Sequence, residues 1–395
     1  MKIAFCTIAS ANYLSRVQVL EKSLHAHYPD ADLRILLCER PECCREIVAK
    51  IGRPVYSPAD VSCVDWLQMA FYYDITEYNT ALKPFFLETL LKEGYEAIVY
   101  FDPDIEVYGD LTFLTRLVTE NDVVLTPHVC KPVPTDAKSP VMASYIRAGQ
   151  FNLGFLGIAN SGEVIELLHW WQSVLVEKCI FDVSHQYFVD QFWAAAFPSF
   201  SDRVCILRDP AYNMAYWNVF QRKLNCLDEQ WVTDSGELKF FRFSGLSRND
   251  LTKVSVHQDR VTAPVGSPLY RLLAGYFDKL QNQEWAEFSD YQYSFAKYAN
   301  GEPITNEERK AFLGMSREER NALGDPFEAN NMPQNIIRVR CHSEMTQNSS
   351  LLASRLEVLN KNVEMLEKNN ALILNSLSWK VTAPLRKIHA LLTGN

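Results

Sequence analysis

Short apolar runs alternate with amphipathic segments along the first hundred residues. Residues 3–8, 33–38 and 97–101 are apolar runs of the length and composition of buried strands. Residues 13–25 and 42–50 lie between them and have the spacing of helices. Strands that alternate with helices in this way predict a doubly wound α/β sheet.

The strand predicted at residues 97–101 ends in an acidic turn, Asp102-Pro103-Asp104. Pro103 has no backbone N–H and cannot continue a central ladder, so both carboxylates project at the carboxyl end of a buried strand, where open α/β sheets bind ligands. Oxygen ligands one residue apart suit Mg²⁺ or Mn²⁺ that also holds a diphosphate. A plain acidic turn between two strands explains the same residues, and at this point both readings stay open.

The pattern continues beyond the acidic turn. Residues 123–125 and 152–158 predict two more strands, and the second contains glycines, which in a strand often mark the close approach of a ligand or of another backbone. Residues 240–245 predict a strand that runs into a turn. Residues 268–330 are helical and rich in aromatic residues; core packing is the favoured role for these rings, with a sugar-stacking platform as the alternative.

Composition narrows the function classes. The chain has 395 residues, 48% of them hydrophobic, and a net charge of -9, which argues against a nucleic-acid binder. Its ten cysteines are scattered without a metal-type Cys-x-x-Cys pair, so we expect them to be reduced. A strand begins at once, which leaves no room for a signal peptide, and no apolar run reaches the length of a membrane span. These features predict a cytoplasmic protein.

The last fifty residues have a different pattern. Apolar residues between 352 and 377 follow a 4-3-4-3 spacing that predicts a coiled coil, and Asn370 falls at an a position, which favours a parallel dimer in register. An amphipathic helix folded back on the globular part is the alternative. Residues 379–392 combine apolar side chains with Lys380, Arg386 and Lys387, which suits shallow attachment to an anionic membrane surface; a frayed terminus is the alternative.

Together these motifs resemble the GT-A glycosyltransferases that use sugar nucleotides, and most closely the glycosyltransferase family 8-like branch. The matching stretches lie within about the first 260 residues and are Phe101-Asp102-Pro103-Asp104, Phe151-Asn152-Leu153-Gly154-Phe155, Asp190-Gln191, Trp217-Asn218 and Phe243-Ser244-Gly245. The ending at residues 378–386 is similar to one found on bacterial envelope-polysaccharide glycosyltransferases. The resemblance implies a GT-A catalytic domain at 1–265 and supports a membrane-surface tail at 379–395. The sequence pattern predicts a helical extension at 266–335 and a coiled coil at 346–378.

The resemblance also implies roles for the matching positions. Ile8, Ala9 and Tyr13 would border the base of the donor, and Lys83 would face the diphosphate or the donor sugar. Asn152 and Gly154 would lie beside that sugar, and Asp190 and Gln191 would lie near its anomeric carbon. Asp102 and Asp104 would hold Mn²⁺ or Mg²⁺ together with the donor ribose or diphosphate.

One position departs from the pattern. The related enzymes often have a metal-binding histidine where this chain has Arg242. Arginine has no free lone pair for a metal, but its planar fork can clamp a diphosphate by bidentate hydrogen bonds. His257 is left as a candidate third ligand, with an ordinary surface or core histidine as the alternative.

The resulting expectation is a retaining, metal-dependent hexosyltransferase with a nucleotide-sugar donor, a UDP-sugar being favoured. Its acceptor would be a saccharide or a lipid-linked sugar in the synthesis of O-antigen, capsule or exopolysaccharide. The enzyme would work as a homo-oligomer on the inner face of the plasma membrane. A sugar-nucleotide nucleotidyltransferase is one alternative, although the expected glycine-rich loop after the first strand is missing. A non-catalytic sugar-nucleotide-binding scaffold is another; the Asp102/Asp104 pair disfavours it, and Arg242 keeps it open.

Overall fold

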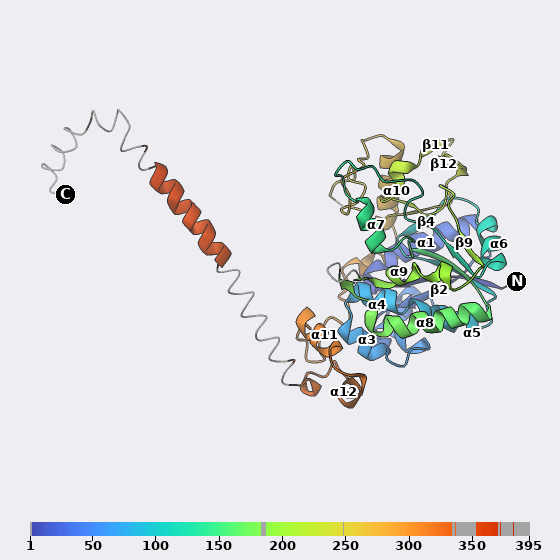
Figure 1. Ribbon diagram of the computed structural model, residues 1–395, viewed down its shortest axis with the longest axis horizontal. Helices are drawn as coiled ribbons and strands as arrows, with labels where there is room; N and C mark the ends of the chain where they lie inside the picture. Colours follow the sequence, from blue (N-terminus) through green and yellow to red (C-terminus); the bar gives the residue numbers. More distant parts are fainter. Residues whose placement is uncertain are drawn as a thin grey trace. The chain divides into compact units, whose positions relative to one another are not determined.

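A six-stranded sheet lies at the centre of the first of two units, Met1–Met332 and Pro333–Asn395 (Figure 1). The computed structural model describes residues 2–182, 187–247, 249–333 and 353–369, together with residues 336, 372 and 382. The predicted boundary between a catalytic domain and a helical extension, at residue 265, falls inside the first unit.

The central sheet has the strand order β2-β1-β3-β6-β5-β9. Strand β1 is parallel to β2 and β3, β6 is antiparallel to β3 and β5, and β5 is parallel to β9. The sheet is therefore mixed, and the prediction of an α/β fold is confirmed. Its strands are β1 (Ile3–Ala9), β2 (Asp32–Leu37), β3 (Ala97–Phe101), β5 (Val123–Leu125), β6 (Phe155–Ala159) and β9 (Val204–Ile206).

Helices cover both faces of this sheet because its strands are apolar on both sides. Phe5 and Val99 share one row of the sheet, and their face packs against helices α1 and α6. Tyr100 points to the opposite face, where α5 packs against β3 and α8. The helices are α1 (Leu14–His27), α2 (Pro41–Ile51), α3 (Trp66–Tyr72), α4 (Ile75–Ala81), α5 (Lys83–Lys92), α6 (Thr112–Glu120), α7 (Met142–Ala148), α8 (Gly162–Lys178) and α9 (Val189–Ala194), with 3-10 turns η1 (Ala11–Tyr13), η2 (Pro58–Asp60), η3 (Phe197–Ser199) and η4 (Val219–Gln221).

A smaller sheet, β10-β14-β4, continues from the carboxyl end of β3. The acidic turn leads directly into β4 (Ile105–Val107), which pairs antiparallel with β14 (Phe240–Arg242), and this register places Arg242 opposite Ile105. Strand β10 (Met214–Ala215) pairs in parallel with the other edge of β14. The remaining strands form two peripheral groups, β7 (Phe181–Asp182) with β8 (Tyr187–Phe188), and β11 (Asn225–Leu227) with β12 (Gln230–Thr233) and β13 (Gly236–Glu237).

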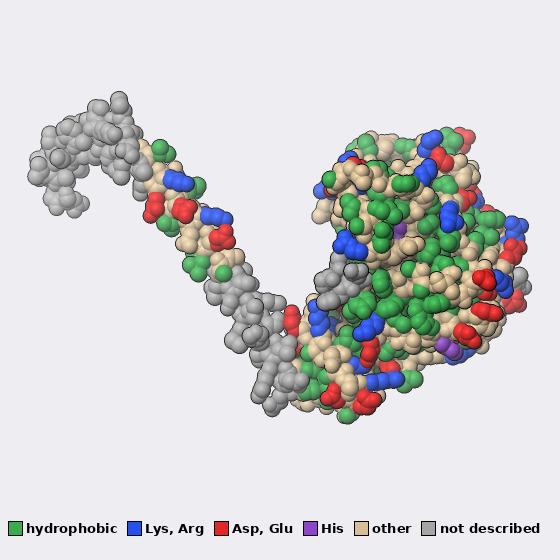
Figure 2. All heavy atoms as spheres, viewed as in Figure 1, with side chains coloured by type: hydrophobic (Ala, Val, Ile, Leu, Met, Phe, Trp, Pro, Cys, Tyr) green, Lys and Arg blue, Asp and Glu red, His purple; other side chains and the backbone are tan. Residues whose placement is uncertain are grey.

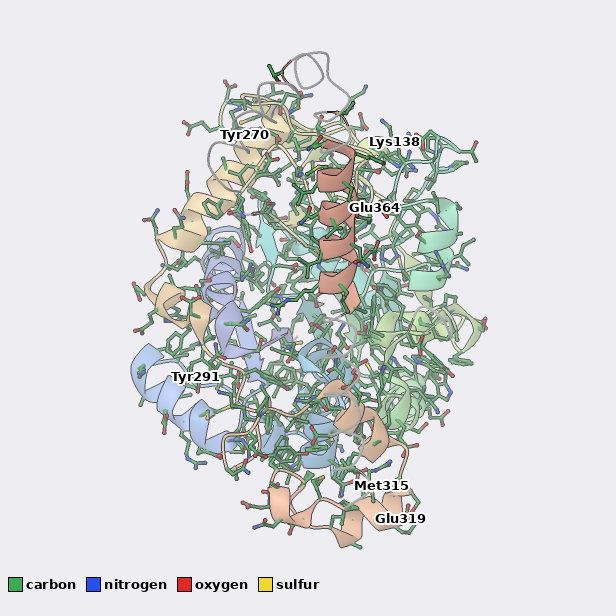
Figure 3. All side chains as sticks on the ribbon, turned by 90° about the vertical axis from the view of Figure 1, so that its left-hand side faces the viewer. Lys138, Tyr270, Tyr291, Met315, Glu319 and Glu364 are labelled. Atoms are coloured by element: carbon green, nitrogen blue, oxygen red, sulfur yellow. The ribbon has the colours of Figure 1, made fainter. Side chains whose placement is uncertain are left out.

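The aromatic segment after residue 265 packs as part of the first unit. Tyr276 lies parallel to Phe243, with ring centroids 3.7 Å apart, and Trp285, Phe288 and Phe295 are buried. Burial of these rings agrees with core packing, the role that the sequence favoured. The segment contains α10 (Pro268–Gln281), η5 (Glu284–Asp290), α11 (Asn306–Leu313), α12 (Arg317–Ala322) and η6 (Ala329–Asn331); Figure 3 labels Tyr270 on α10 and Met315 between α11 and α12.

The described part of the second unit contains a helix over residues 353–369. Leu356, Leu359, Val363 and Leu366, all on the predicted heptad, are each more than half exposed, and charged side chains lie between the apolar ones along this helix (Figure 2). Pairing in a coiled coil stays a prediction. Leu352, Asn370, Leu377 and, apart from residue 382, the basic segment 379–392 lie outside the described residues. None of the helices in the described part of the chain combines the length and the hydropathy needed to cross a bilayer.

Candidate functional site

A cavity of about 560 Å³ lies beside the carboxyl end of β3. Its walls come from segments far apart in the sequence: the end of β3, the loop before β6, helices α4, α7 and α9, and the end of β14. The polar side chains that line it include Lys83, Asp102, Asn152, Asp190 and Arg242. The fold therefore brings together the motifs that the sequence analysis singled out.

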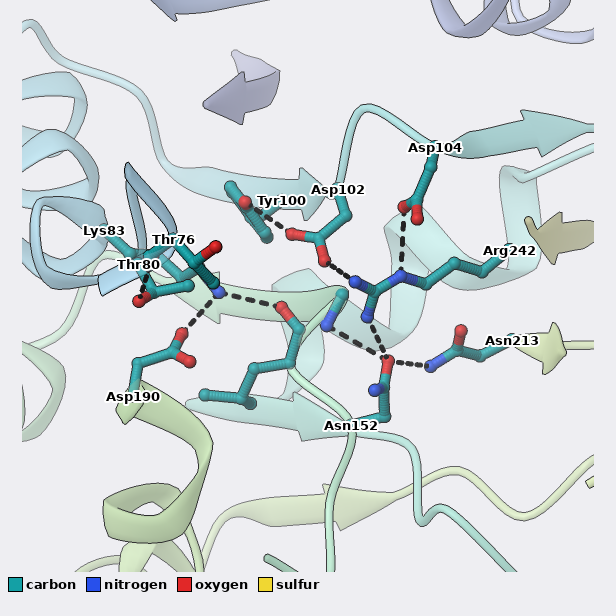
Figure 4. Close-up of polar contacts among 12 residues, drawn as sticks. Thr76, Thr80, Lys83, Tyr100, Asp102, Asp104, Asn152, Asp190, Asn213 and Arg242 are labelled. Atoms are coloured by element: carbon teal, nitrogen blue, oxygen red, sulfur yellow. Dashed lines mark hydrogen bonds and ion pairs between the residues drawn. The ribbon is translucent and has the colours of Figure 1, made fainter. Parts of the chain in front are cut away.

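Arg242 occupies the space between the two carboxylates of the acidic turn (Figure 4). Its Nε donates to Asp104 Oδ1 at 3.0 Å, and its Nη2 forms an ion pair with Asp102 Oδ2. Burial by itself would lower the pKa of Arg242, but the two carboxylates raise it overall. Burial raises the pKa of Asp104, and the Arg242 charge opposes that shift. The guanidinium thus stays charged and holds both aspartates.

Asn152 joins the other side of the guanidinium to a buried polar network. Its Oδ1 accepts from Arg242 Nη1 at 3.2 Å, from the Gly154 backbone N–H at 3.1 Å and from Asn213 Nδ2 at 3.2 Å. Its Nδ2 donates to His128 Nε2 at 3.2 Å, and His128 Nδ1 donates to a backbone carbonyl. This network fixes the Asn152 amide and, through it, the orientation of Arg242.

Gly154 leaves room for the arginine. A Cβ at this position would lie 2.3 Å from Arg242 Nη1, which no side chain can accommodate without displacing the guanidinium. The Gly154 carbonyl also accepts from the Asp102 backbone N–H at 2.7 Å. The sequence predicted a close approach at this glycine, and here the approaching group is the Arg242 side chain.

Lys83 and Asp190 form a buried ion pair on the opposite side of the cavity. Lys83 Nζ lies 2.5 Å from Asp190 Oδ2, donates to the Leu153 carbonyl at 2.9 Å and lies 4.3 Å from the centre of the Tyr100 ring. Both side chains are at most 3% exposed. Burial raises the pKa of Asp190, and the Lys83 charge opposes this. In this structure Lys83 faces Asp190, and its predicted contact with the diphosphate or the donor sugar stays a prediction.

Asp190 and Gln191 begin α9, and both line the cavity. Val189, directly before them, has φ of +43°, a conformation that is strained for a β-branched residue. A Cβ at Gly149 would lie 2.6 Å from the Gln191 backbone carbonyl, so only glycine leaves room for it. The strained turn directs the two polar side chains toward the cavity.

The predicted metal ligands do not form a suitable donor set. Both carboxylates of the acidic turn are engaged by Arg242, and Asp102 Oδ1 also accepts from Tyr100 Oη at 2.6 Å. His257 lines the same cavity and packs against Tyr216 at 5.7 Å between ring centroids. Among the residues that the structure describes, no three His, Cys, Asp or Glu side chains converge as a metal-binding group. The expected Asp102, Asp104 and His257 site therefore does not fit a divalent ion.

The residues predicted to border the base lie apart from this cavity. Ile8 and Ala9 are buried in β1, and Tyr13 is 37% exposed with Arg16 stacked on its ring at 4.2 Å. None of the three is among the described residues that line the cavity. Their role at a base stays a prediction.

His128 and Asn213 were not named from the sequence, and Trp217 was named only as part of a matching motif, without a role. Asn213 and Trp217 lie in a polar, aromatic loop whose backbone is tied by Asn218, which accepts from the Ala215 N–H and donates to the Asn213 carbonyl. Trp217 lies 5.6 Å below the Arg242 guanidinium. The Trp-Asn motif was a usable signal for this loop, whereas His128 follows a short strand without any local motif.

No protein-family model matches this chain. It is 25% identical over 253 residues to the uncharacterized protein YfnD of Bacillus subtilis (strain 168), a match that covers 62% of this chain and 78% of that protein.

Among solved structures, the chain is similar to the glycosyltransferase GlyE of Streptococcus pneumoniae TIGR4, with a TM-score of 0.41 and 17% identity over 73% of this chain and 62% of that one. It is also similar to the galactosyltransferase LgtC, with a TM-score of 0.38 and 15% identity over 69% and 95% of the two chains. The bifunctional glycosyltransferase WbbM gives a TM-score of 0.41 and 14% identity over 74% and 52%. TM-scores below 0.5 carry no inference about function, so the chemistry of this site has to be argued from its own residues.

Proposed function

We propose that this protein is a glycosyltransferase that takes a sugar from a nucleoside diphosphate donor. The observation that carries the proposal is the convergence of Arg242, Asp102, Asn152, Asp190 and Gln191 on one cavity at the end of a central strand. Guanidinium N–H groups suit phosphate oxygens, and carboxylate and amide groups suit sugar hydroxyls. The motif resemblance to sugar-nucleotide enzymes supports the same assignment.

In the proposed reaction the bond between the anomeric carbon and the diphosphate oxygen breaks, and its electron pair stays on the diphosphate. An acceptor hydroxyl oxygen bonds to the anomeric carbon, and its proton leaves to the departing phosphate or to solvent. Arg242 stabilises the charge that develops on the diphosphate. Asp190, held by Lys83, and Gln191 lie on the side assigned to the anomeric carbon, where a carboxylate stabilises positive charge on the sugar ring. We keep retention of configuration as part of the proposal.

The donor, the acceptor and the pathway follow from the resemblance, and the proposals for the tail rest on its sequence pattern. We propose a UDP-sugar donor, a hexosyl group, and a saccharide or lipid-linked acceptor in bacterial surface-polysaccharide synthesis. We also propose that residues 352–377 pair in a dimeric coiled coil and that residues 379–395 attach the protein to an anionic membrane surface. The expected divalent cofactor is left out of this proposal because the donor set does not fit it.

The test combines donor binding with nucleotide release. Full-length protein is screened by thermal shift against UDP-, GDP- and dTDP-sugars, because a ligand that binds the native state raises the melting temperature. The best donor is then incubated with the protein and a panel of saccharide acceptors, and released nucleoside diphosphate is measured by chromatography. We expect one nucleotide class to raise the melting temperature and one acceptor to accelerate release.

The variant Gln191→Ala separates chemistry from binding, because Gln191 lines the cavity next to Asp190. We expect it to bind the donor and to release nucleotide at least tenfold more slowly. Gln68→Ala, on α3 and away from the cavity, is the matched control and keeps the wild-type rate. Binding without release in the wild-type protein is the result that a scaffold predicts, and an absence of both refutes the proposal.

A further inference from the structure

We infer that Arg242 is a built-in cation that takes the place of a divalent metal ion between Asp102 and Asp104, so that this site binds a diphosphate without metal. The inference rests on the proposed function and concerns how the same cavity holds its donor. It follows from how the guanidinium is held, from what that leaves of the carboxylates, and from the donors that still face the cavity.

The guanidinium is held on every side by residues that fit it. Both aspartates and Asn152 accept hydrogen bonds or ion pairs from it (Figure 4). The Trp217 ring lies 5.6 Å from the centre of the guanidinium. The pairing of β14 with β4 fixes the backbone of Arg242 opposite Ile105, the residue after Asp104. Gly154 provides the space for Nη1. An arginine on a solvent-exposed strand end would need none of these features.

The same arrangement leaves the carboxylates unavailable to a divalent ion. A metal placed between Asp102 and Asp104 would meet the positive charge of Arg242 at the same position, and it would have to displace the Nε bond to Asp104. Arginine itself has no lone pair to offer a metal. His257, which is also in the cavity, does not complete a three-ligand group within the described residues.

The guanidinium keeps donors for a ligand. Of its five N–H groups, the contacts with Asp102, Asp104 and Asn152 use three, so among the described residues these contacts leave two at a side chain that lines the cavity. Two parallel N–H groups match two oxygens of a diphosphate. Since the arginine brings one positive charge where a divalent ion brings two, we expect nucleotide binding of moderate affinity with a clear dependence on ionic strength.

The experiment uses the full-length protein and two probes, Mn²⁺ alone and UDP. If the thermal-shift screen selects another donor class, the nucleoside diphosphate of that class replaces UDP. Mn²⁺ binding is measured by loss of the free-ion signal in electron paramagnetic resonance, and nucleotide binding by calorimetry in EDTA and in Mn²⁺. For the wild-type protein we expect no Mn²⁺ site that depends on Asp104, and nucleotide affinities in the two buffers that agree within about twofold.

The variant Arg242→His converts the prediction into a gain of function. An imidazole nitrogen beside two carboxylates supplies the third ligand that the wild-type site lacks. We expect Arg242→His to bind one Mn²⁺ and its nucleotide affinity to fall at least tenfold when EDTA replaces Mn²⁺. Arg203→His is the matched control: Arg203 is exposed and pairs with the single carboxylate of Asp122, so no metal site is expected.

A second variant keeps the test decisive if Arg242→His folds poorly. Arg242→Lys retains the charge without the fork, so nucleotide binding should weaken and should stay insensitive to EDTA. Wild-type nucleotide binding that is lost in EDTA, or a wild-type Mn²⁺ site that Asp104→Asn removes, overturns the inference while leaving the proposed function intact. If no nucleotide binds in either buffer, the proposed function fails, and the Mn²⁺ measurements still decide whether Arg242 excludes a metal.

Discussion

His128 is buried in its neutral form, and this makes the stability of the protein depend on pH in a specific way. Burial is the largest cause that lowers its pKa, from an ordinary 6.5 to about 4, and the nearby charge of Arg242 acts in the same direction. The neutral form is also the one that the network needs, because Nε2 accepts from Asn152. A second proton on this ring would place two donors against each other and a cation near Arg242.

The sign and size of the effect follow from linkage. Between pH 6.5 and about 4 the unfolded chain binds a proton at His128 and the folded chain does not, so the free energy of unfolding falls as the pH is lowered. Above pH 6.5 the contribution is fully present, and below pH 4 no more is lost. A shift of about 2.5 units corresponds to about 3 kcal/mol in total, and the part lost between pH 7 and pH 5 is about 2 kcal/mol.

The assay is urea unfolding of the wild-type protein and His128→Gln at pH 7, 6 and 5. Buried carboxylates with raised pKa values, such as Asp104 and Asp190, contribute with the opposite sign, so the difference between the two proteins is the informative quantity. We expect His128→Gln to be less stable at pH 7 and to lose about 2 kcal/mol less than the wild-type protein between pH 7 and pH 5. His27→Gln, at the end of α1, is the control. Equal losses for wild type and His128→Gln would refute the reasoning.

Two further predictions concern the glycine beside Arg242 and the tail. Gly154→Ala should destabilise the protein by about 1–3 kcal/mol, as overpacking does, and should weaken nucleotide binding because the new Cβ displaces the Arg242 guanidinium. The control is Gly162→Ala, where nothing lies within 4 Å, and it should change neither stability nor binding. Wild-type nucleotide binding by Gly154→Ala would show that the contact between Gly154 and Arg242 is unimportant. Deleting residues 346–395 should give a monomer by light scattering that still binds nucleotide, whereas deleting 379–395 should keep the oligomer and abolish flotation with anionic vesicles. A monomeric full-length protein contradicts the coiled coil, and unchanged flotation contradicts the membrane attachment.

The order and type of the main elements were predictable from the sequence because they follow from local patterns. Strands β1, β2, β3 and β5 lie within one or two residues of their predicted positions. Each is a continuous apolar run or a periodic segment with a clear boundary. A boundary at Leu82 separates helices α4 and α5, and Pro84 in the first turn of α5 is a local signal of this boundary.

The candidate site was predictable only as a set of residue types. The sequence indicated that Asp102 and Asp104 carry chemistry, because carboxylates directly after a buried strand are a local pattern. The roles of Asp190 and Arg242 came from the family resemblance. Which charge faces which was decided by the tertiary structure. The register of β14 on β4 sets Arg242 beside the aspartates, and α5 sets Lys83 against Asp190.

His128 illustrates the remaining limit. It is more than a hundred residues away from Arg242 in the chain, yet one asparagine links them. Nothing near His128 in the sequence distinguishes it from an ordinary histidine, since its neutral state arises from burial and from partners supplied by distant loops. The sequence by itself determined the strands, the helices and the kinds of groups that this protein could bring to a ligand. Only the tertiary structure decided their pairing, because ion pairs and hydrogen bonds depend on distances of a few ångströms between segments that the chain keeps far apart.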